Sequence, residues 1–528
     1  MKACRRIFSL LLTALLTVTL FTPDSSGVNV QQGDESSKPR TYYEIFVYSF
    51  CDSDGDGIGD LNGVASKLDY LQELGVNGIW LMPIHPAESY HKYDISDYYG
   101  IDPQYGTLED FDHLMAECEK RDIQVILDLV LNHTAPTHTW FRRAKAYLEG
   151  LAPGEEPDLT VCPYVDYYFF TREQPNNTYY PLNGGNWYYE GKFWSGMPDL
   201  NLDNAALREE IRQIMDFWLN RGVSGFRLDA VKEYFSGQTQ KNIDTLRFIT
   251  ETAKEIKPDA YLVAEVWENF QTIAEYYKSG VDSIFDFPFA DTSGKITTVL
   301  RGADNEKTVR SFATAQEKAY AAYAASNPNF VDAPFLSNHD TGRIAGFCSR
   351  DVDKMKLAGA MNLLMSGTAF VYYGEELGMP GSGNDPSKRA PMLWNLTGAD
   401  GVTNPPPECV LPEEYPLGSL QEQREDPQSI YNYYRQAIAL RSAIPAISRG
   451  VPTAETALNC GTVSATRKTD GENIAIVLLN IGTQTAAVDL TDYRGFALAG
   501  TLTTGESPVT LDSGTLTLPP YAAAVLTK

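Results

Sequence analysis

Positive charge is scarce in this sequence. Its 528 residues include 43 lysines and arginines against 69 aspartates and glutamates, which gives a formal net charge of −26 and an isoelectric point near 4.6. Nucleic-acid phosphates bind basic surfaces, so this balance argues against a nucleic-acid-binding protein. It favours a soluble protein whose partner is neutral or cationic.

Paired cysteines, tandem repeats and a basic tail are absent as well. No two cysteines form a C-x-x-C pair, so the sequence has no zinc or redox motif of that kind, and nothing indicates an organic cofactor. Disulfides form in exported proteins, but the spacing predicts no connectivity, and free buried thiols are at least an equal alternative. The cysteines lie at positions 4, 51, 118, 162, 348, 409 and 460.

The sequence also has no apolar run of the length that a membrane span needs. The stretch Ile7–Phe21 follows the basic segment MKACRR, and its length suits the apolar region of a signal peptide. We expect a signal peptide over residues 1–27, a polar linker over 28–40, and a secreted protein with no membrane span in the mature chain. An uncleaved N-terminal anchor is the weaker alternative.

From residue 41 onward, short apolar segments alternate with helical patterns. Strands that alternate with helices predict parallel βα units, and eight of them predict an α/β fold of the (β/α)8 TIM-barrel type. In that fold the catalytic groups lie at the carboxyl ends of the strands. The eight expected strands are 41–50, 78–84, 124–133, 225–231, 261–267, 283–289, 334–340 and 367–374.

Two stretches interrupt this alternation and divide the chain into domains. Residues 134–200 are rich in Tyr, Gly, Asn and Pro, and a loop of that length indicates a small domain inserted after the third strand. After about residue 447, short strands follow one another with Gly and Asp turns, which predicts a C-terminal all-β domain. The expected boundaries are 41–133 and 201–446 for the barrel, 134–200 for the insertion and 447–528 for the C-terminal domain. A second irregular stretch, 375–427, is expected at the rim of the cleft.

The segment GFRLDAVKE (225–233) is the strongest candidate for chemistry. Residues two apart in a strand point to the same side, so Arg227 and Asp229 share one face. An arginine at that distance lowers the pKa of the aspartate and keeps it ionised, which a carboxylate nucleophile needs. The nonapeptide alone favours a buried structural ion pair equally.

Two further carboxyls at expected strand ends decide between these readings. Glu265 lies in the apolar context VAEVW, where burial raises the pKa of a carboxyl, and Asp340 ends another strand. Two carboxyls about 5–5.5 Å apart support retaining glycoside hydrolysis. In that chemistry the ionised Asp229 is the nucleophile and the protonated Glu265 is the general acid/base.

The loop DSDGDGIGD (52–60) is a candidate metal site. Alternating acids and glycines form a tight turn that directs oxygens inward, and hard oxygen ligands suit calcium. The loop resembles the start of an EF-hand loop, but the twelfth position is Gly63 and a strand precedes it. We expect a structural Ca²⁺ site, with Mg²⁺ or a solvated acidic turn as alternatives. Its expected ligands are Asp52, Asp54, Asp56, Asp60 and the Ile58 carbonyl.

Five segments together resemble the signature regions of glycoside hydrolase family 13, the α-amylase family. They occur in the family's order along the chain: DLVLNH (128–133), MPDLN (197–201), GFRLDAVKE (225–233), EVW (265–267) and FLSNHD (335–340). The resemblance covers essentially all of the chain after residue 40. It implies a barrel, an insertion after the third strand and a C-terminal β-sandwich. MPDLN resembles the branch intermediate between oligo-1,6-glucosidase-like and neopullulanase-like enzymes. The acidic loop resembles a calcium site of the branch that contains oligo-1,6-glucosidases and similar amylases.

The same resemblance implies a role for each matching residue. Asp229 would be the nucleophile, Glu265 the acid/base, and Asp340 the carboxylate that holds sugar hydroxyls in the transition state. The substrate-binding residues that it implies are Tyr93, His133, Arg227, Lys232 and His339. A monomeric enzyme acting on an α-glucan is the expectation that follows.

The sequence departs from the family at two positions that bear on specificity. Amylases of the family have Lys-His where this chain has Lys232-Glu233, which puts binding on the leaving-group side in doubt. Exo-acting α-glucosidases of the family have an Asp at the position of Tyr90. Endo-acting amylases have a Tyr there, as this chain does. We therefore expect a cleft that is open on the non-reducing side.

These observations favour an α-amylase that cleaves α-1,4 bonds of starch, glycogen or maltooligosaccharides through a covalent glucosyl-enzyme. The alternatives are an α-glucosidase, a neopullulanase or a 4-α-glucanotransferase of the same family. A non-catalytic glucan-binding or transporter-associated protein on the same scaffold is a distant alternative, because all three carboxylates and Arg227 are present.

Overall fold

The computed structural model describes residues 40–182, 186–396, 398 and 401–528. The expected signal peptide and all but the last residue of the expected linker lie outside the described residues. Within the described part of the chain, no helix combines the length and the hydropathy that a membrane crossing needs.

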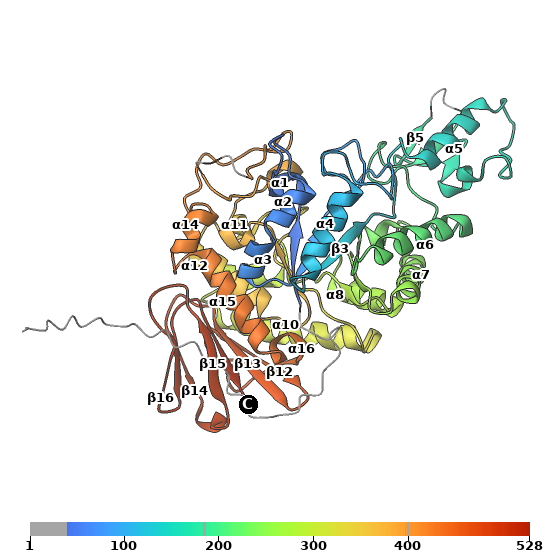
Figure 1. Ribbon diagram of the computed structural model, residues 1–528. Coiled ribbons are helices and arrows are strands. Elements are labelled where there is room, and N and C mark those ends of the chain that lie inside the picture. Colours follow the sequence, from blue (N-terminus) through green and yellow to red (C-terminus); the bar gives the residue numbers. More distant parts are fainter. Residues whose placement is uncertain (1–39, 183–185, 397, 399–400) are drawn as a thin grey trace, which may run out of the picture. The chain divides into compact units, whose positions relative to one another are not determined.

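A parallel sheet forms the centre of the fold (Figure 1). Its strands follow the order β10-β1-β2-β3-β7-β8-β9, and each neighbouring pair is parallel. Almost every residue in them is buried, as expected for strands that are covered on both faces. The strands are β1 (Thr41–Ile45), β2 (Gly78–Leu81), β3 (Gln124–Leu129), β7 (Gly225–Leu228), β8 (Tyr261–Ala264), β9 (Ser283–Ile284) and β10 (Ala369–Tyr372).

The predicted strand over 334–340 is wrong, because that segment closes the barrel without forming a strand. Ala333 makes a parallel bridge with Phe285, and its carbonyl accepts the N–H of Asp286 at 3.1 Å. On the other side, the Pro334 carbonyl accepts the N–H of Phe370 at 2.9 Å. Proline has no N–H to donate, so a regular ladder cannot continue through Pro334. The barrel is therefore complete, with seven strands and one irregular closing segment.

Helices connect the barrel strands, as the alternation of strands with helical patterns predicted. Helix α4 begins with a capping box between Thr107 and Asp110, and the Asn204 side chain caps α6. The α-helices outside the insertion are α1 (Val47–Phe50), α2 (Leu61–Ser66), α3 (Leu68–Leu74), α4 (Leu108–Glu119), α6 (Ala205–Asn220), α7 (Thr239–Ile256), α8 (Phe270–Tyr276), α9 (Lys295–Arg301), α10 (Glu306–Ser326), α11 (Ile344–Phe347), α12 (Val352–Leu363), α13 (Asp385–Lys388), α14 (Leu420–Glu425), α15 (Ile430–Ala443) and α16 (Ala446–Arg449). Short 3₁₀ helices are η3 (Val231–Glu233), η4 (Tyr277–Ser279), η5 (Glu375–Leu377) and η6 (Thr491–Tyr493).

The stretch between β3 and α6 has secondary structure of its own, as an inserted domain should. It contains α5 (Thr139–Gly150), η2 (Pro163–Tyr167) and a small antiparallel sheet in the order β4-β6-β5. These strands are β4 (Phe170–Thr171), β5 (Tyr179–Pro181) and β6 (Tyr188–Glu190). A bridge from His133 to Asp199 joins the two ends of the insertion beside the carboxyl end of β3, and a second bridge from Tyr168 to Leu200 joins its middle to its end.

The C-terminal part consists of two antiparallel sheets, which confirms the all-β prediction. One sheet has the order β11-β12-β13-β18-β15 and the other β14-β17-β16, with a shared apolar core that includes Ile476, Val488 and Leu516. The strands are β11 (Val451–Ala454), β12 (Val463–Asp470), β13 (Asn473–Asn480), β14 (Ala486–Asp489), β15 (Ala497–Leu502), β16 (Thr510–Asp512), β17 (Thr515–Leu518) and β18 (Ala522–Thr527).

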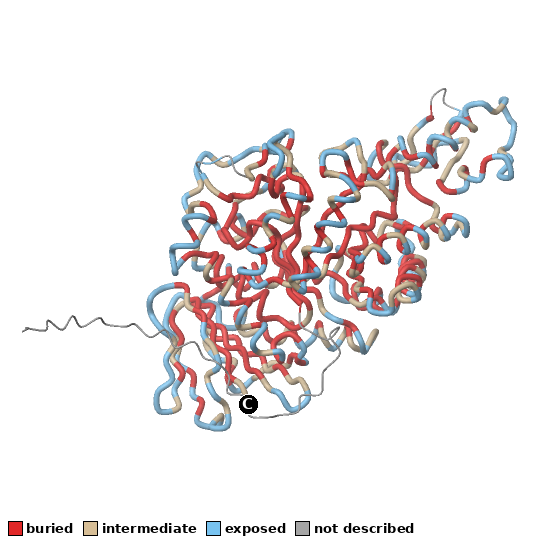
Figure 2. Tube along the Cα trace, in the orientation of Figure 1, coloured by how far each residue is buried: buried red, intermediate tan, exposed pale blue. Residues whose placement is uncertain are grey.

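Aromatic side chains fill the interior of the barrel beneath the strand ends. The rings of Tyr42 and Phe370 stack at 5.2 Å between centroids, and Trp80 contacts Phe285 at 5.3 Å. The tube coloured by burial shows the buried residues concentrated along the central strands (Figure 2). Trp80 also donates its indole N–H to Asp128 at 3.3 Å, so the aromatic core of the barrel contacts the polar groups at the strand ends.

None of the six described cysteines forms a disulfide, so the alternative of free thiols holds for this part of the chain. Four of them are buried, Cys409 is half-buried and Cys460 is exposed.

Candidate active site

Arg227 on β7 is the centre of the polar cluster at the carboxyl ends of the strands. Its guanidinium is fully buried, and Nη1 lies 2.6 Å from Asp229 Oδ1 and 2.8 Å from Asp128 Oδ1. Nη2 lies 3.1 Å from Glu265 Oε2. The predicted shared face of Arg227 and Asp229 is confirmed. Unlike a purely structural ion pair, this one has its Asp229 carboxyl at the wall of a cavity.

Glu265 follows β8, and its surroundings favour a protonated carboxyl near neutral pH. Burial raises its pKa to about 7; Arg227 opposes this rise, while the charges of Asp229 and Asp340 add to it. Its Oε2 accepts the backbone N–H of Ala230 at 2.8 Å. The prediction that burial raises this pKa is confirmed.

Ala230 takes a backbone conformation that is uncommon for a residue with a side chain. Its φ of 46° lies in the left-handed region, at the turn between β7 and η3. This turn directs the N–H of Ala230 at Glu265 and leaves Asp229 at the end of the strand. Sequence analysis did not predict this contact, because no residue type around Ala230 indicates a left-handed conformation there.

Asp340 is held by two cations. His339 Nε2 lies 3.0 Å from Asp340 Oδ2, and Arg389 Nη2 lies 2.9 Å from Asp340 Oδ1. Burial alone would raise the pKa of Asp340, but the neighbouring His339 and Arg389 outweigh it and hold that pKa well below its usual range. Asp340 is therefore ionised at any pH at which the enzyme would work.

His339 carries a positive charge because it lies between two carboxyls. Its Nδ1 is 2.5 Å from Glu44 Oε1, while Nε2 faces Asp340. Burial lowers the pKa of His339, but Asp340 and Glu44 together raise it to about 9. Glu44 was not predicted, although it lies at the carboxyl end of the first strand, where polar groups are informative.

Tyr93 and His133 lie beside these groups, as the family resemblance implied. The Tyr93 ring stacks on the ring of His339 at 5.4 Å, and its hydroxyl donates to Asp128 at 2.9 Å. Burial lowers the pKa of His133, which keeps its imidazole neutral. His133 lines the cavity, and its buried Nε2 makes no side-chain hydrogen bond among the described residues.

Lys232 lies at the cavity edge but is engaged with the neighbouring strand end. Its Nζ donates to the Trp267 carbonyl at 3.2 Å and pairs with Glu268 at 3.2 Å. The carbonyl of the next residue, Glu233, accepts the side-chain N–H of Asn132 at 2.8 Å.

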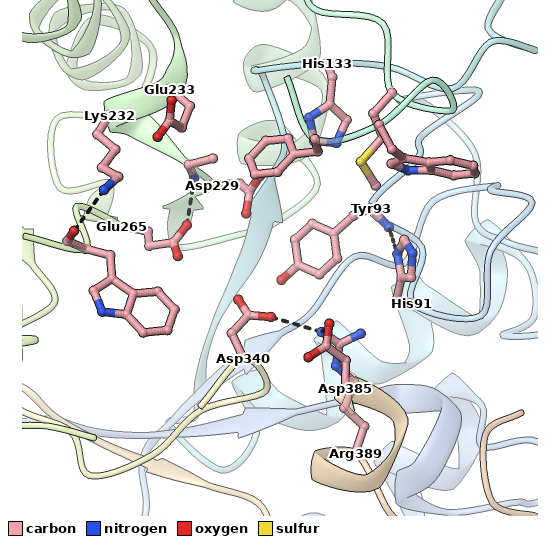
Figure 3. A pocket seen from close by; sticks show the side chains of 15 residues that line it. His91, Tyr93, His133, Asp229, Lys232, Glu233, Glu265, Asp340, Asp385 and Arg389 are labelled. Atoms are coloured by element: carbon pink, nitrogen blue, oxygen red, sulfur yellow. Dashed lines mark hydrogen bonds and ion pairs between the residues drawn. The ribbon is translucent and has the colours of Figure 1, made fainter. Parts of the chain in front are cut away.

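One cavity of about 640 Å³ adjoins these groups (Figure 3). Its lining includes Tyr93, His133, Asp229, Lys232, Glu265, Asp340 and Arg389, whereas Arg227, His339, Asp128 and Glu44 are not part of it. Glu265, Lys232 and Glu233 lie at one end of it, His91, Asp385 and Arg389 at the other, with Asp229 between them. Three large aromatics that are about half exposed, Phe193, Trp194 and Trp267, also line it. The lining residues that the sequence did not predict are His91, Phe193, Trp194, Met197, Ala230, Trp267, Asp385 and Arg389.

Arg389 is the most important residue that sequence reasoning missed. It lies in the irregular stretch after β10, which was expected only to form part of the cleft rim. Its Nε donates to the His339 carbonyl at 3.1 Å and its Nη1 to the Tyr90 hydroxyl at 3.1 Å. The available signal was the basic pair Lys388-Arg389 in the rim segment.

In the acidic loop, three of the expected ligands come together. Carboxylate oxygens of Asp52, Asp54 and Asp60 all lie within 4.8 Å of one another. Gly55 and Gly57 have φ values of 86° and 91°, a conformation that glycine adopts without strain. The hard oxygen donors of this group fit a calcium ion. Asp56 is not part of the group, and with the Ile58 carbonyl it stays a prediction.

Comparison with known proteins identifies the family. The family model described as alpha amylase, catalytic domain, matches residues 44–450. The chain belongs to the α-amylase family. Alpha-amylase 3 of Dictyoglomus thermophilum is 41% identical over 420 residues, which cover 78% of this chain and 79% of that protein.

Relatives with other names show that the α-amylase family spans several activities. The solved structure of Eubacterium rectale Amy13B has a TM-score of 0.90 and 44% identity, and the match covers 93% of this chain and 96% of that one. The oligo-1,6-glucosidase of Heyndrickxia coagulans is 28% identical over 572 residues, covering 92% and 98% of the two chains. This chain is therefore an α-amylase-type glycoside hydrolase whose bond specificity must be argued from its site.

Proposed function

We propose that the protein is an endo-acting α-amylase that cleaves α-1,4-glucosidic bonds of starch, glycogen and maltooligosaccharides with retention of configuration. The observation that carries the proposal is the shared contact with Arg227. Asp229 and Glu265 each bind one terminal nitrogen of this guanidinium. This supports the short carboxyl separation of retaining enzymes, about 5–5.5 Å, over the 6.5–9.5 Å of inverting ones.

The two carboxyls would then act in two steps. An oxygen of the ionised Asp229 attacks the anomeric carbon while Glu265 donates its proton to the leaving glycosidic oxygen. This gives a glucosyl ester on Asp229. Glu265, now ionised, takes a proton from water, and the water oxygen attacks the same carbon and releases Asp229. Asp340, kept ionised by its two cations, would hold sugar hydroxyls near the developing positive charge.

Endo action is supported by the residue at position 90. The Tyr90 hydroxyl accepts the Arg389 N–H at 3.1 Å, where exo-acting relatives by resemblance have a carboxylate that binds the chain end. A cleft without that carboxylate accepts glucan chains that extend beyond the attacked glucose.

Product analysis on amylose tests the proposal. We expect mixed oligosaccharides at early times, because an endo-enzyme cuts within the chain. Glucose as the only early product would overturn endo action. Asp229→Asn is expected to abolish hydrolysis, and survival of starch hydrolysis in that variant would contradict the assignment of the nucleophile.

A preference for α-1,6 bonds is the second candidate, because the leaving-group side of the cavity departs from that of amylases at Glu233. This carboxylate lines the cavity where amylases of the family have an imidazole. Cleavage of isomaltose or pullulan at rates above those on maltotriose would support this candidate. Transfer products from maltotriose would instead favour the glucanotransferase alternative.

We propose in addition that the acidic loop binds a structural Ca²⁺ and that the protein is exported. The clustered Asp52, Asp54 and Asp60 support the first point, and the basic and apolar N-terminal sequence supports the second. A calcium titration followed by intrinsic fluorescence and N-terminal sequencing of secreted protein test them separately.

A further inference from the structure

A loop of the insertion forms one wall of the active-site cavity. We call residues Gly191–Met197 the aromatic arm, because Phe193 and Trp194 project from it and, with Met197, line the cavity. The exposed fractions of Phe193 and Trp194 are 49% and 50%, far above what apolar packing would leave. The arm thus offers rings to a ligand at its exposed face.

The base of the arm is closed by hydrogen bonds within the insertion. Asp199 donates its N–H to the Glu190 carbonyl at 2.9 Å, and its Oδ2 accepts the N–H of Lys192 at 2.9 Å. The Trp194 carbonyl accepts the N–H of Met197 at 3.0 Å. These bonds define the shape of the arm, but none of them attaches it to the opposite side of the cavity.

An ion pair joins the arm to η3, in addition to the edge-on contact of the Phe193 ring with the His133 ring at 5.4 Å between centroids. Lys192 Nζ in the arm lies 3.1 Å from Glu233 Oε2 in η3, which follows the nucleophile strand. The side chains are 34% and 19% exposed, so water screens the pair only in part.

Glu233 is a rigid anchor for this contact. Its backbone carbonyl accepts the Asn132 side-chain N–H at 2.8 Å, and its Oε2 also accepts the Ser236 hydroxyl at 2.7 Å. In Figure 3 Glu233 lies at the same end of the cavity as Glu265 and Lys232. A displacement of Lys192 from this anchor would therefore displace Phe193 and Trp194, the next two residues, within the cavity.

We propose that the Lys192–Glu233 ion pair is a positioning device that holds the aromatic arm in place for glucan binding. Neither residue takes part in the chemical step. This inference rests on the proposed function, because it assumes that α-glucans fill the cavity.

Single and paired substitutions test the ion pair with maltoheptaose as substrate. We expect Lys192→Gln and Glu233→Gln each to raise KM about threefold to tenfold, with kcat within about twofold of wild type, since lost binding that is uniform along the reaction raises KM alone. Lys192→Glu combined with Glu233→Lys restores the opposite charges and is expected to recover most of the wild-type KM.

Lys254→Gln is the matched control. Lys254 pairs with Asp282 at 2.8 Å with exposed fractions of 31% and 25%, away from the cavity. It should leave KM unchanged, whatever it does to the thermal midpoint. If Lys192 and Glu233 had a purely structural role, Lys192→Gln and Glu233→Gln would lower the thermal midpoint of the protein without raising KM. That result would overturn the proposal.

Salt gives a second measurement that needs no charge-swap variant to fold. The substrate is uncharged, and 1 M salt shortens the screening length to about 3 Å. We expect KM of the wild type to rise with NaCl toward that of Glu233→Gln, while KM of this variant stays constant. Equal salt dependence in both would contradict the proposal. A wild type that does not hydrolyse maltoheptaose would contradict the proposed function instead, and maltoheptaose affinity from calorimetry on the same variants would then decide on the ion pair.

Discussion

A single buried arginine sets the chemistry of the two reacting carboxyls. Arg227 contacts both Asp229 and Glu265, yet burial still raises the pKa of Glu265 to about 7. Arg227 therefore holds Asp229 by an ion pair, but its charge does not lower the pKa of Glu265 enough to ionise that carboxyl below neutral pH. Different environments around one guanidinium let two carboxyls take the roles of nucleophile and acid.

The pH dependence of kcat/KM should report the proton on Glu265. The acid must be protonated to donate, so we expect kcat/KM on maltooligosaccharides to fall as pH rises above about 7, approaching tenfold per pH unit. An α-maltosyl fluoride needs no proton on its leaving group, and with this control the alkaline decline should vanish. A decline centred near the ordinary glutamate value, or one shared by the fluoride, would contradict the role of Glu265.

Arg389 should be sensitive even to a conservative change. It binds Asp340, the His339 carbonyl and the Tyr90 hydroxyl with separate nitrogens, and lysine cannot reproduce that fork. We expect Arg389→Lys to lower kcat/KM on maltooligosaccharides by about tenfold or more, because Asp340 loses a charge-assisted hydrogen bond. Steady-state kinetics measure this. Lys318→Arg, at an exposed position on α10, is the control that should have no effect; similar kinetics for both variants would rule out the role of Arg389.

At the scale of elements, short connections after the strands carry the site. The acidic loop joins α1 to α2, and the Asp60 side chain also caps α2 by accepting the N–H of Gly63 at 2.7 Å. The Gly57 carbonyl accepts the N–H of Asn404 at 2.7 Å, which ties the loop to the rim segment. An ion bound here would therefore order both the start of α2 and part of the rim.

Removal of metal tests this loop. We expect a chelator to lower the thermal midpoint of the wild type and Ca²⁺ to restore it, since a ligand at 100 times its Kd stabilises by about 2.7 kcal/mol. Asp54→Asn should reduce the Ca²⁺ response, and Asp158→Asn, an exposed acid in the insertion, should leave it intact. A midpoint that responds to neither chelator nor Ca²⁺ in the wild type would exclude a stabilising ion.

For the whole molecule, a buried polar contact joins the C-terminal sheet to the barrel. Lys468 on β12 is fully buried, and its Nζ donates to the Ser366 hydroxyl at 2.9 Å, just before β10. Burial lowers the pKa of Lys468 well below its usual range, and the nearby Arg441 adds to this effect. Below the usual lysine pKa the unfolded chain binds this proton more readily, so Lys468 opposes folding at neutral pH.

Replacing this lysine should therefore stabilise the protein. We expect Lys468→Met to raise the free energy of unfolding, because methionine fills a similar volume and has no amine that loses its hydration on folding. The Ser366 hydroxyl still donates to the Gly450 carbonyl at 2.7 Å, so no donor is left without a partner. Urea unfolding measures the change, with Lys318→Met on the exposed face of α10 as the control. A loss of stability in Lys468→Met would show that its contact outweighs the cost of burial.

The sequence by itself determined the barrel, the insertion, the all-β C-terminal part and the three carboxyls. The reason is local: alternating strands and helices have distinct periodicities, and a barrel places the ends of its strands together. The shared face of Arg227 and Asp229 follows from their spacing alone. Burial of Glu265 follows from the apolar residues around it in the chain.

Only the tertiary structure decided which distant side chains support these groups. Glu44, Arg389 and the aromatic arm reach the site from other strands, from the rim and from the insertion, and no local pattern encodes such contacts. The closing segment at Ala333 and Pro334 was predicted as a strand because its apolar composition fits one, but hydrogen bonding between segments far apart in sequence determined its form. The sequence was enough to predict that the three carboxyls lie at strand ends. Their protonation states and the residues that contact them depend on packing across the whole barrel.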